Sequence, residues 1–285
     1  MRIGIIGLGL IGGSIGLALK RANWREAEIT GYVRRPEVGS MAISSGFVDK
    51  VELNLKDTVK NADLVIIATP VLTIKDILAQ IAPHLQPECI TTDTASTKLQ
   101  VMQWAKEMLP PQISFVGGHP MAGKETSGIR AAEANLFHNR AYCLTPAPQA
   151  KSTAVQTVID MVKKLGANPL TIGAQEHDNL VAGISHLPML LSVALVLVTT
   201  RNPSWELMSQ LASSGYRDLT RLASSNPEIN AHICLSNQAA ITSWIDDFIK
   251  ELQSLRKLVS NNSSEIEKAL ALASEARQKW LEKRS

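Results

Sequence analysis

The stretch that most constrains the fold lies at the start of the chain. An apolar run at residues 2–6 is followed at once by a glycine-rich turn, and helical sequence comes next. The turn consists of Gly7, Leu8, Gly9, Leu10, Ile11 and Gly12. In a G-x-G-x-x-G turn between strand and helix, the glycines permit a tight turn, close approach of a pyrophosphate, and close packing of helix on strand. The helix N-terminus attracts phosphate. The pattern predicts dinucleotide binding; the alternative is a turn that serves packing only.

The end of the next predicted strand, residues 28–32, indicates which dinucleotide binds. An NAD site usually carries an acidic residue here for the ribose 2′-hydroxyl, but this chain has Val33, Arg34 and Arg35. Guanidinium groups pair with a 2′-phosphate, whereas a carboxylate would repel it. We therefore predict that Arg34 and Arg35 select NADP. The alternative is that both arginines coat a solvated loop and that the protein accepts either cofactor.

Predicted strands alternate with helical sequence over the first part of the chain. The strands span residues 2–6, 28–32, 63–68, 88–93, 113–116, 141–145 and 169–172. A continuous apolar run such as residues 64–68 is typical of a central parallel strand covered on both faces. The alternation predicts an α/β fold with a Rossmann-type, doubly wound parallel sheet, in a dinucleotide-binding domain of residues 1–173.

From residue 174 onward the sequence is helical. We expect helices at about 175–200, 203–223 and 227–260, with a kink at Pro188. Ser264 and Glu267 form a capping-box pattern before a last helix. We assign residues 174–285 to an all-helical substrate and dimerisation domain. Because a domain this small and apolar gains stability by covering its surface with a second copy, we predict a homodimer.

Composition excludes several classes of protein. The 285 residues carry a net charge of +3 and only 4% aromatic side chains, which disfavours nucleic-acid binding. Three distant cysteines without zinc-site spacing fit a reduced, metal-free protein. Because the sequence opens directly into a predicted strand, we expect no signal peptide. Its longest apolar run, residues 187–198, is too short to cross a bilayer and is interpreted as a core helix. We expect a cytoplasmic protein that binds no membrane.

Polar residues follow several predicted strands at one edge of the sheet. Thr69 and Pro70 lie where a cofactor ribose or nicotinamide would bind. Ser96 is either a hydrogen-bonding site residue or the N-cap of a helix at residues 97–108. His119 follows the strand at 113–116, and an imidazole suits removal of a hydroxyl proton as hydride leaves. The alternative for His119 is a structural histidine.

The helical part supplies further candidates. His186 lies two residues before Pro188, and Arg217 and Arg221 lie four residues apart. An arginine fork would bind a substrate carboxylate. The alternatives are a structural histidine and a solvated or capping pair of arginines.

Five motifs in this order resemble the prephenate/arogenate dehydrogenase family of tyrosine biosynthesis. They span residues 7–12, 93–98, 118–123, 185–188 and 218–223. The resemblance covers nearly the whole chain. It implies a Rossmann domain followed by a helical dimerisation domain, and oxidative decarboxylation of a small cyclohexadienol. Two departures stand out: Thr94 and Thr97 are small changes within the second motif, and Val33 followed by Arg34 resembles the NADP-using members.

The resemblance also implies roles for individual residues. His119 is implied to be the base for the ring 4-hydroxyl, and Ser96 to hydrogen-bond that hydroxyl and the histidine. His186 is implied to be a second substrate-pocket histidine. Arg221 is implied to bind a substrate carboxylate, with Arg217 as its nearest competitor. A desolvated pocket should lower the pKa of His119 and keep it neutral as a base.

Arogenate and prephenate differ in one group, an amino acid against a keto acid. Lys124 and Glu125 are candidates of opposite sign for recognising that group. The resemblance to NADP-dependent members without fused domains favours arogenate, with prephenate as the alternative substrate.

Two rival functions come from other classes. A β-hydroxyacid dehydrogenase would need a helix lysine as acid and base, and residues 176–183 contain none. A catalytically silent NADP-sensing module would not need His119, Ser96 and Arg221 together.

Overall fold

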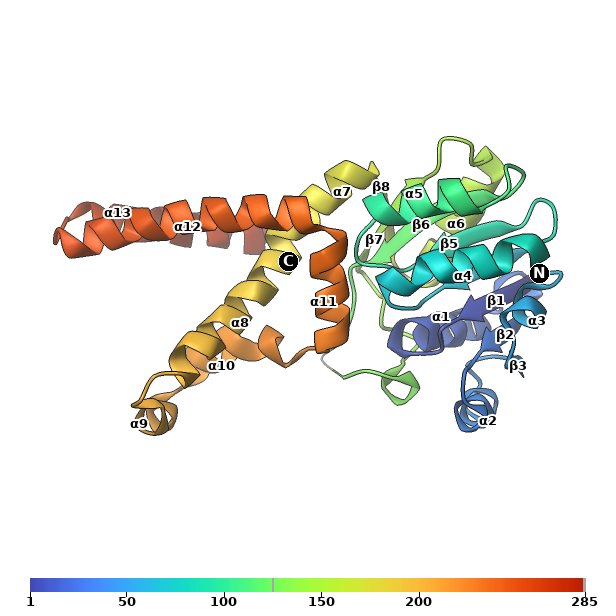
Figure 1. Ribbon diagram of the computed structural model, residues 1–285, viewed down its shortest axis with the longest axis horizontal. Coiled ribbons are helices and arrows are strands. Elements are labelled where there is room, and N and C mark those ends of the chain that lie inside the picture. The colour runs from blue at the N-terminus through green and yellow to red at the C-terminus, as the bar shows by residue number, and fades with distance from the viewer. Residues whose placement is uncertain (125, 284–285) are drawn as a thin grey trace. The chain divides into compact units, whose positions relative to one another are not determined.

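The computed structural model describes residues 1–124 and 126–283. Within these residues, eight strands form one sheet in the order β3-β2-β1-β4-β5-β6-β7-β8 (Figure 1). They are β1 (Arg2–Ile6), β2 (Glu28–Tyr32), β3 (Lys50–Glu52), β4 (Leu64–Ile67), β5 (Ile90–Asp93), β6 (Ser114–Pro120), β7 (Ala141–Pro146) and β8 (Asn168–Thr171). The predicted α/β fold with a mainly parallel sheet is confirmed. It differs in two details: the sequence does not predict β3, and β7 runs antiparallel to β6.

Helices cover both faces of this sheet. They are α1 (Leu10–Arg21), α2 (Pro36–Ser44), α3 (Leu55–Val59), α4 (Ile74–Ile81), α5 (Leu99–Met108) and α6 (Ser152–Lys164). Because side chains alternate along a strand, Ile5 of β1 packs in the core with residues of α1 and α6, and Ile6 packs with residues of α4 and α5. The strand order reverses between β1 and β4. In open α/β sheets, ligands bind at the carboxyl ends of the strands at such a reversal.

A run of helices follows β8. They are α7 (Ala174–Val181), the π-helical turn η5 (Ala182–His186), α8 (Leu187–Thr200), α9 (Trp205–Leu211), α10 (Ser214–Thr220), the 3₁₀ turn η6 (Arg221–Ser224) and α11 (Pro227–Ser236). The predicted disturbance at Pro188 takes the form of the π-helical turn just before it. A proline has no N–H to donate to the preceding turn, and wider turns accommodate such interruptions. The helix expected over residues 227–260 is broken at Asn237, where φ is −131° and ψ is 36°.

The chain divides into two compact units, residues 1–238 and 239–285. The second unit contains nearly all of α12 (Gln238–Ser260) and the whole of α13 (Glu265–Glu282). The domain boundary placed after residue 173 stays a prediction. The predicted capping box is wrong: Ser264 has helical backbone angles and its side chain caps nothing. Instead, the neighbouring Ser263 hydroxyl accepts a hydrogen bond from the Glu265 N–H at 3.3 Å.

The interpretation of residues 187–198 as a core helix is wrong for the single chain. The buried residues of α8 are Leu187, Met189 and Ser192, and Val198 is 67% exposed. By length and composition, the run from Ala174 to Thr200 could span a membrane: an 18-residue window within it has a mean hydropathy of 2.2, and 33% of that window is buried. Most residues of α8 are therefore partly buried or exposed, and Leu197 and Val198 are its exposed large apolar side chains.

Candidate functional site

The glycine turn has the shape that a pyrophosphate requires. Gly7 adopts a φ of +100°, which favours glycine, and a Cβ on Gly12 would lie 2.1 Å from the Gly7 carbonyl oxygen. A Cβ on Gly9 would meet nothing within 4 Å, so the backbone is open to a ligand at that position. No side chain caps α1, and its first turn holds no acidic residue. The residues present therefore fit a dinucleotide, whose phosphates the free N–H groups of the turn and of α1 would bind.

A cleft of about 340 Å³ opens beside this turn, within the size range of small-molecule sites. The carboxyl ends of β1, β4 and β5, the loop after β6, and α11 form its walls. Of the predicted site residues, seven line it: Gly9, Leu10, Ile11, Thr69, Pro70, Ser96 and Lys124. Leu8 is buried behind the turn, where its side chain fills the space above Gly31. The structure thus gathers most of the residues predicted to hold the cofactor around one cleft.

The predicted arginines do not line this cleft. Arg34 and Arg35 follow β2 on the surface, and Arg35 Nε lies 4.0 Å from the Glu37 carboxylate. Arg217 is exposed and pairs with Asp218 at 3.5 Å, and Arg221 is also exposed at the start of η6. The Lys124 ammonium lies 2.8 Å from the Glu133 carboxylate. Glu125, the other candidate beside it, lies outside the described residues.

His119 lies near the end of β6, a strand in which all seven residues are buried. Its Nδ1 is 2.9 Å from Nε2 of His177 in α7, and Nδ1 of His177 is 2.7 Å from the Asp178 carboxylate. Burial, followed by the neighbouring His177 and Lys98, holds the pKa of His119 well below its usual value of 6.5. The direction is the one predicted from the sequence. His119 is therefore a neutral imidazole near pH 7.

A buried ion pair anchors the backbone just before His119. The Lys98 ammonium contacts the Asp93 carboxylate, and both side chains are fully buried. Lys98 Nζ also donates to the Gly118 carbonyl oxygen at 2.6 Å, while the Gly118 N–H donates to Asp93 at 3.0 Å. Burial lowers the pKa of Lys98, and the charge of Asp93 opposes that shift. The pair holds the end of β5 against the end of β6.

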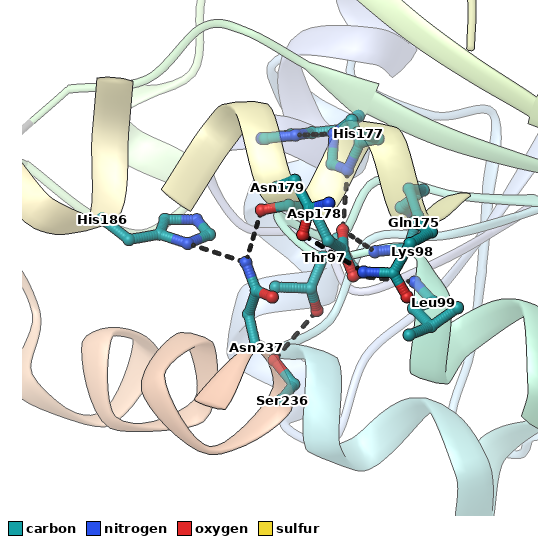
Figure 2. A network of polar contacts seen from close by, with 12 residues as sticks. Thr97, Lys98, Leu99, Gln175, His177, Asp178, Asn179, His186, Ser236 and Asn237 are labelled. Atoms are coloured by element: carbon teal, nitrogen blue, oxygen red, sulfur yellow. Dashed lines mark hydrogen bonds and ion pairs between the residues drawn. The ribbon is translucent and has the colours of Figure 1, made fainter. Parts of the chain in front are cut away.

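The start of α5 shows that the capping interpretation of Ser96 is wrong. The backbone N–H groups of Lys98 and Leu99 donate to the two carboxylate oxygens of Asp178, at 2.7 and 2.9 Å (Figure 2). Asp178, which comes from α7, therefore caps this helix. Ser96 is left half-buried on the cleft wall, available to a ligand.

His186 is buried in the same network, which Figure 2 draws. The Asn237 side-chain nitrogen donates to the Asp178 carbonyl oxygen at 2.8 Å and lies 3.3 Å from His186 Nδ1. Because that nitrogen is a donor, His186 Nδ1 accepts and its proton sits on Nε2. The buried Nε2 has no hydrogen-bond partner among the described residues. Burial lowers the pKa of His186 to about 4.

Sequence reasoning missed Asp93, Lys98, His177 and Asp178 as parts of the site. The first two lie in one of the motifs that carried the resemblance, but their pairing is visible only in the fold. His177 and Asp178 lie on a helix that the sequence showed only to lack a lysine. No periodicity or spacing in the sequence points to them.

The chain matches two family models. One is described as the nucleotide-binding domain of prephenate dehydrogenase, over residues 15–170, and the other as its dimerization domain, over residues 173–272. A prephenate dehydrogenase of Bacillus subtilis is 36% identical over 263 residues, which cover 92% of this chain and 71% of that protein.

Two solved structures are also similar to this chain. The arogenate dehydrogenase of Synechocystis is 33% identical with a TM-score of 0.84, over 98% of this chain and 100% of that one. A prephenate dehydrogenase from A. aeolicus, solved with hydroxyphenyl propionate and NAD+, is 27% identical with a TM-score of 0.91, over 98% of each chain.

Proposed function

The chain belongs to the prephenate/arogenate dehydrogenase family, and we propose that it converts L-arogenate to L-tyrosine and CO₂ with NADP⁺ as the oxidant. The observation that carries this proposal is a buried imidazole, His119, that contacts His177 and lies near the end of β6, the strand whose following loop borders a cleft with a dinucleotide turn. We expect NADPH to form when the protein is mixed with arogenate and NADP⁺. If the protein reduced NADP⁺ neither with arogenate nor with prephenate, that result would contradict the proposal.

In the proposed reaction, His119 Nε2 accepts the proton of the ring 4-hydroxyl, and Ser96 hydrogen-bonds the same oxygen. The bound nicotinamide supplies the chemistry of a two-electron hydride acceptor. As the ring carboxylate leaves as CO₂, the electron pair of the broken C–C bond completes the aromatic ring. The proton returns from His119 to the phenol oxygen, so neither a proton nor an electron is left over. The protein contributes chiefly by orienting substrate and cofactor and by keeping the base dry.

Cofactor choice depends on Arg34 in this proposal. We expect Arg34→Asp to lower kcat/KM for NADP⁺ by about 10- to 100-fold, because a charged hydrogen bond to the 2′-phosphate is lost and a repulsion is gained. The value for NAD⁺ should stay the same or rise. Arg35→Asp is the matched control and should have a smaller effect, because Arg35 already has Glu37 nearby. Equal losses with both cofactors would show that Arg34 does not read the 2′-phosphate.

The substrate assignment has two supports. The first is the similarity to the arogenate dehydrogenase of Synechocystis. The second is that Lys124, the cation among the described cleft residues, is neutralised by Glu133 and so offers little to a keto acid. Arogenate and prephenate assayed side by side with NADP⁺ test it. A tenfold or greater preference for prephenate would overturn the substrate assignment and leave the family membership intact.

We propose that Arg221 binds a substrate carboxylate, on the basis of its motif, and that His186 Nε2–H faces the substrate. Arg221→Ala should raise the KM for the substrate about 10- to 100-fold with a smaller change in kcat, as expected for the loss of a charged hydrogen bond made in both ground and transition states. Arg217→Ala is the matched control and should change KM less than threefold. A reversed order of effects would assign the carboxylate to Arg217.

The rival functions make different predictions. A β-hydroxyacid dehydrogenase needs a lysine that α7 lacks, and a sensing module would show no turnover in the arogenate assay. We further propose a cytoplasmic homodimer. Exposed leucines and valines on α8, α9 and α10 support a protein partner for the first unit, as Val259, Leu270 and Trp280 do for the second. Light scattering coupled to gel filtration measures the mass, and a monomer would contradict the homodimer.

A further inference from the structure

A chain of hydrogen bonds runs from Asp178 through His177 to His119. The three groups lie within residues 1–238, and all are buried. His119 Nδ1 lies 2.9 Å from His177 Nε2, and His177 Nδ1 lies 2.7 Å from the Asp178 carboxylate. The rings of His119 and His177 meet edge to face, with an interplanar angle of 73°. The direction of each bond in this chain can be worked out from the chemistry of its ends.

Asp178 sets the direction. Its carboxylate accepts hydrogen bonds from the backbone N–H groups of Lys98 and Leu99 at the start of α5 (Figure 2). Both oxygens of this carboxylate already accept from backbone N–H groups, and a carboxylate offers only lone pairs, so Asp178 accepts from His177 as well. His177 Nδ1 must therefore carry a proton and donate it to Asp178. In a neutral imidazole with one nitrogen protonated, the other nitrogen accepts, so His177 Nε2 is an acceptor.

The acceptor on His177 in turn determines which nitrogen of His119 carries the proton. His119 Nδ1 lies 2.9 Å from an acceptor and must carry the proton. The lone pair is then on Nε2, the nitrogen that the proposed reaction needs as a base. If the proton sat on Nε2 instead, two lone pairs would face each other between the rings. His177 could relieve that contact only by giving up its bond to Asp178 or by taking up a second proton, which would place a charge on a buried ring.

We propose that His177, oriented by Asp178, is a positioning residue that fixes His119 in the Nδ1–H tautomer and so presents Nε2 as the base. The inference rests on the proposed function for its consequence, but not for its geometry. When His119 takes the proton from substrate, it keeps donating through Nδ1 to His177, and the carboxylate of Asp178 balances the new positive charge through the intervening ring. No second proton transfer is needed.

The kinetic test uses two substitutions that differ in whether an acceptor remains. His177→Leu removes the acceptor, and we expect kcat to fall about 100-fold with KM values for substrate and NADP⁺ within threefold, as a wrong tautomer costs an enzyme of the triad type 10⁴-fold. His177→Gln keeps an amide oxygen that accepts from His119 Nδ1–H, and should stay within tenfold of the unchanged protein. His84→Leu, at an exposed histidine, is the matched control. Equal kcat losses for the leucine and glutamine variants would indicate a structural role only and overturn the proposal.

The tautomer itself is measured without substrate. In protein labelled with ¹⁵N-histidine, the ring nitrogen signals of His119, identified by their loss in His119→Asn, should report a proton on Nδ1. In His177→Leu they should shift towards Nε2–H. A proton on Nε2 in the unchanged protein would overturn the proposal. Because this readout needs no turnover, it separates a failure of this inference from a failure of the proposed function.

Discussion

We expect His119→Asn to lower kcat for the proposed reaction, NADPH formation from arogenate, by about 10³-fold, with KM values changed little. The expected size is that of general-base catalysis, 10²- to 10⁴-fold. Asparagine preserves much of the shape and polarity of the side chain but cannot take up a proton. The rate is measured from NADPH absorbance with both substrates saturating.

Ser96→Ala is the comparison that separates the base from its neighbour. A neutral hydrogen bond to the 4-hydroxyl is worth about 1.5 kcal/mol at most, so kcat should fall only about tenfold. The proposed roles require that the loss of kcat be far larger in His119→Asn than in Ser96→Ala. A loss of less than tenfold in His119→Asn would remove this residue from the chemistry.

We expect Lys98→Met to lower the free energy of unfolding by about 3–5 kcal/mol, the typical cost of breaking a buried ion pair. The substitution leaves the Asp93 carboxylate fully buried without its cation and removes the bond to the Gly118 carbonyl. Denaturant unfolding followed by circular dichroism measures the change. Lys106→Met, at an exposed lysine of α5, the helix that follows Lys98, is the matched control and should lie within about 0.5 kcal/mol of the unchanged protein.

The double variant Lys98→Met/Asp93→Asn tests the reason for that cost. The asparagine removes the stranded charge and keeps an acceptor for the Gly118 N–H, so the double variant should be more stable than Lys98→Met alone. Additive losses would mean that the stability comes from packing at each position rather than from the pair.

The nucleotide-binding half was predictable because its signals are local. Each central strand is a short apolar run, and the glycine turn stands between a strand and a helix where both elements can be recognised. The sequence does not predict β3, because this strand has only three residues and one apolar side chain, Val51. The sequence also does not predict the antiparallel direction of β7, because that direction depends on the long connection after β6. Among the described residues of that connection, the only helical structure is a 3₁₀ turn, η4 (Ile129–Ala131), where a parallel crossover usually has a helix.

The site was predictable only in its parts that carry motifs. His119, Ser96 and the glycine turn stand in recognisable patterns. The groups that orient His119 do not, because His177 is 58 residues away from it and Asp178 is 80 residues from the backbone N–H of Lys98 that it binds. Pairings at such separations depend on the fold and leave no periodic trace. The burial of α8 was misjudged for a related reason, since among the described residues most of its apolar side chains are partly buried or exposed.

The most direct test of the central claim, that a neutral imidazole at position 119 is the base, is the pH dependence of kcat/KM for arogenate. A lowered pKa means that His119 stays neutral above it and is protonated only as pH falls through it. Because burial, His177, Lys98 and His186 all lower the pKa of His119, the profile should be flat from pH 8 down through 6.5 and should fall only in more acidic solution. That acid limb should be absent in His119→Asn. A protonation step at or above pH 6.5 that vanishes in His119→Asn, or an acid limb unchanged in that variant, would contradict the account.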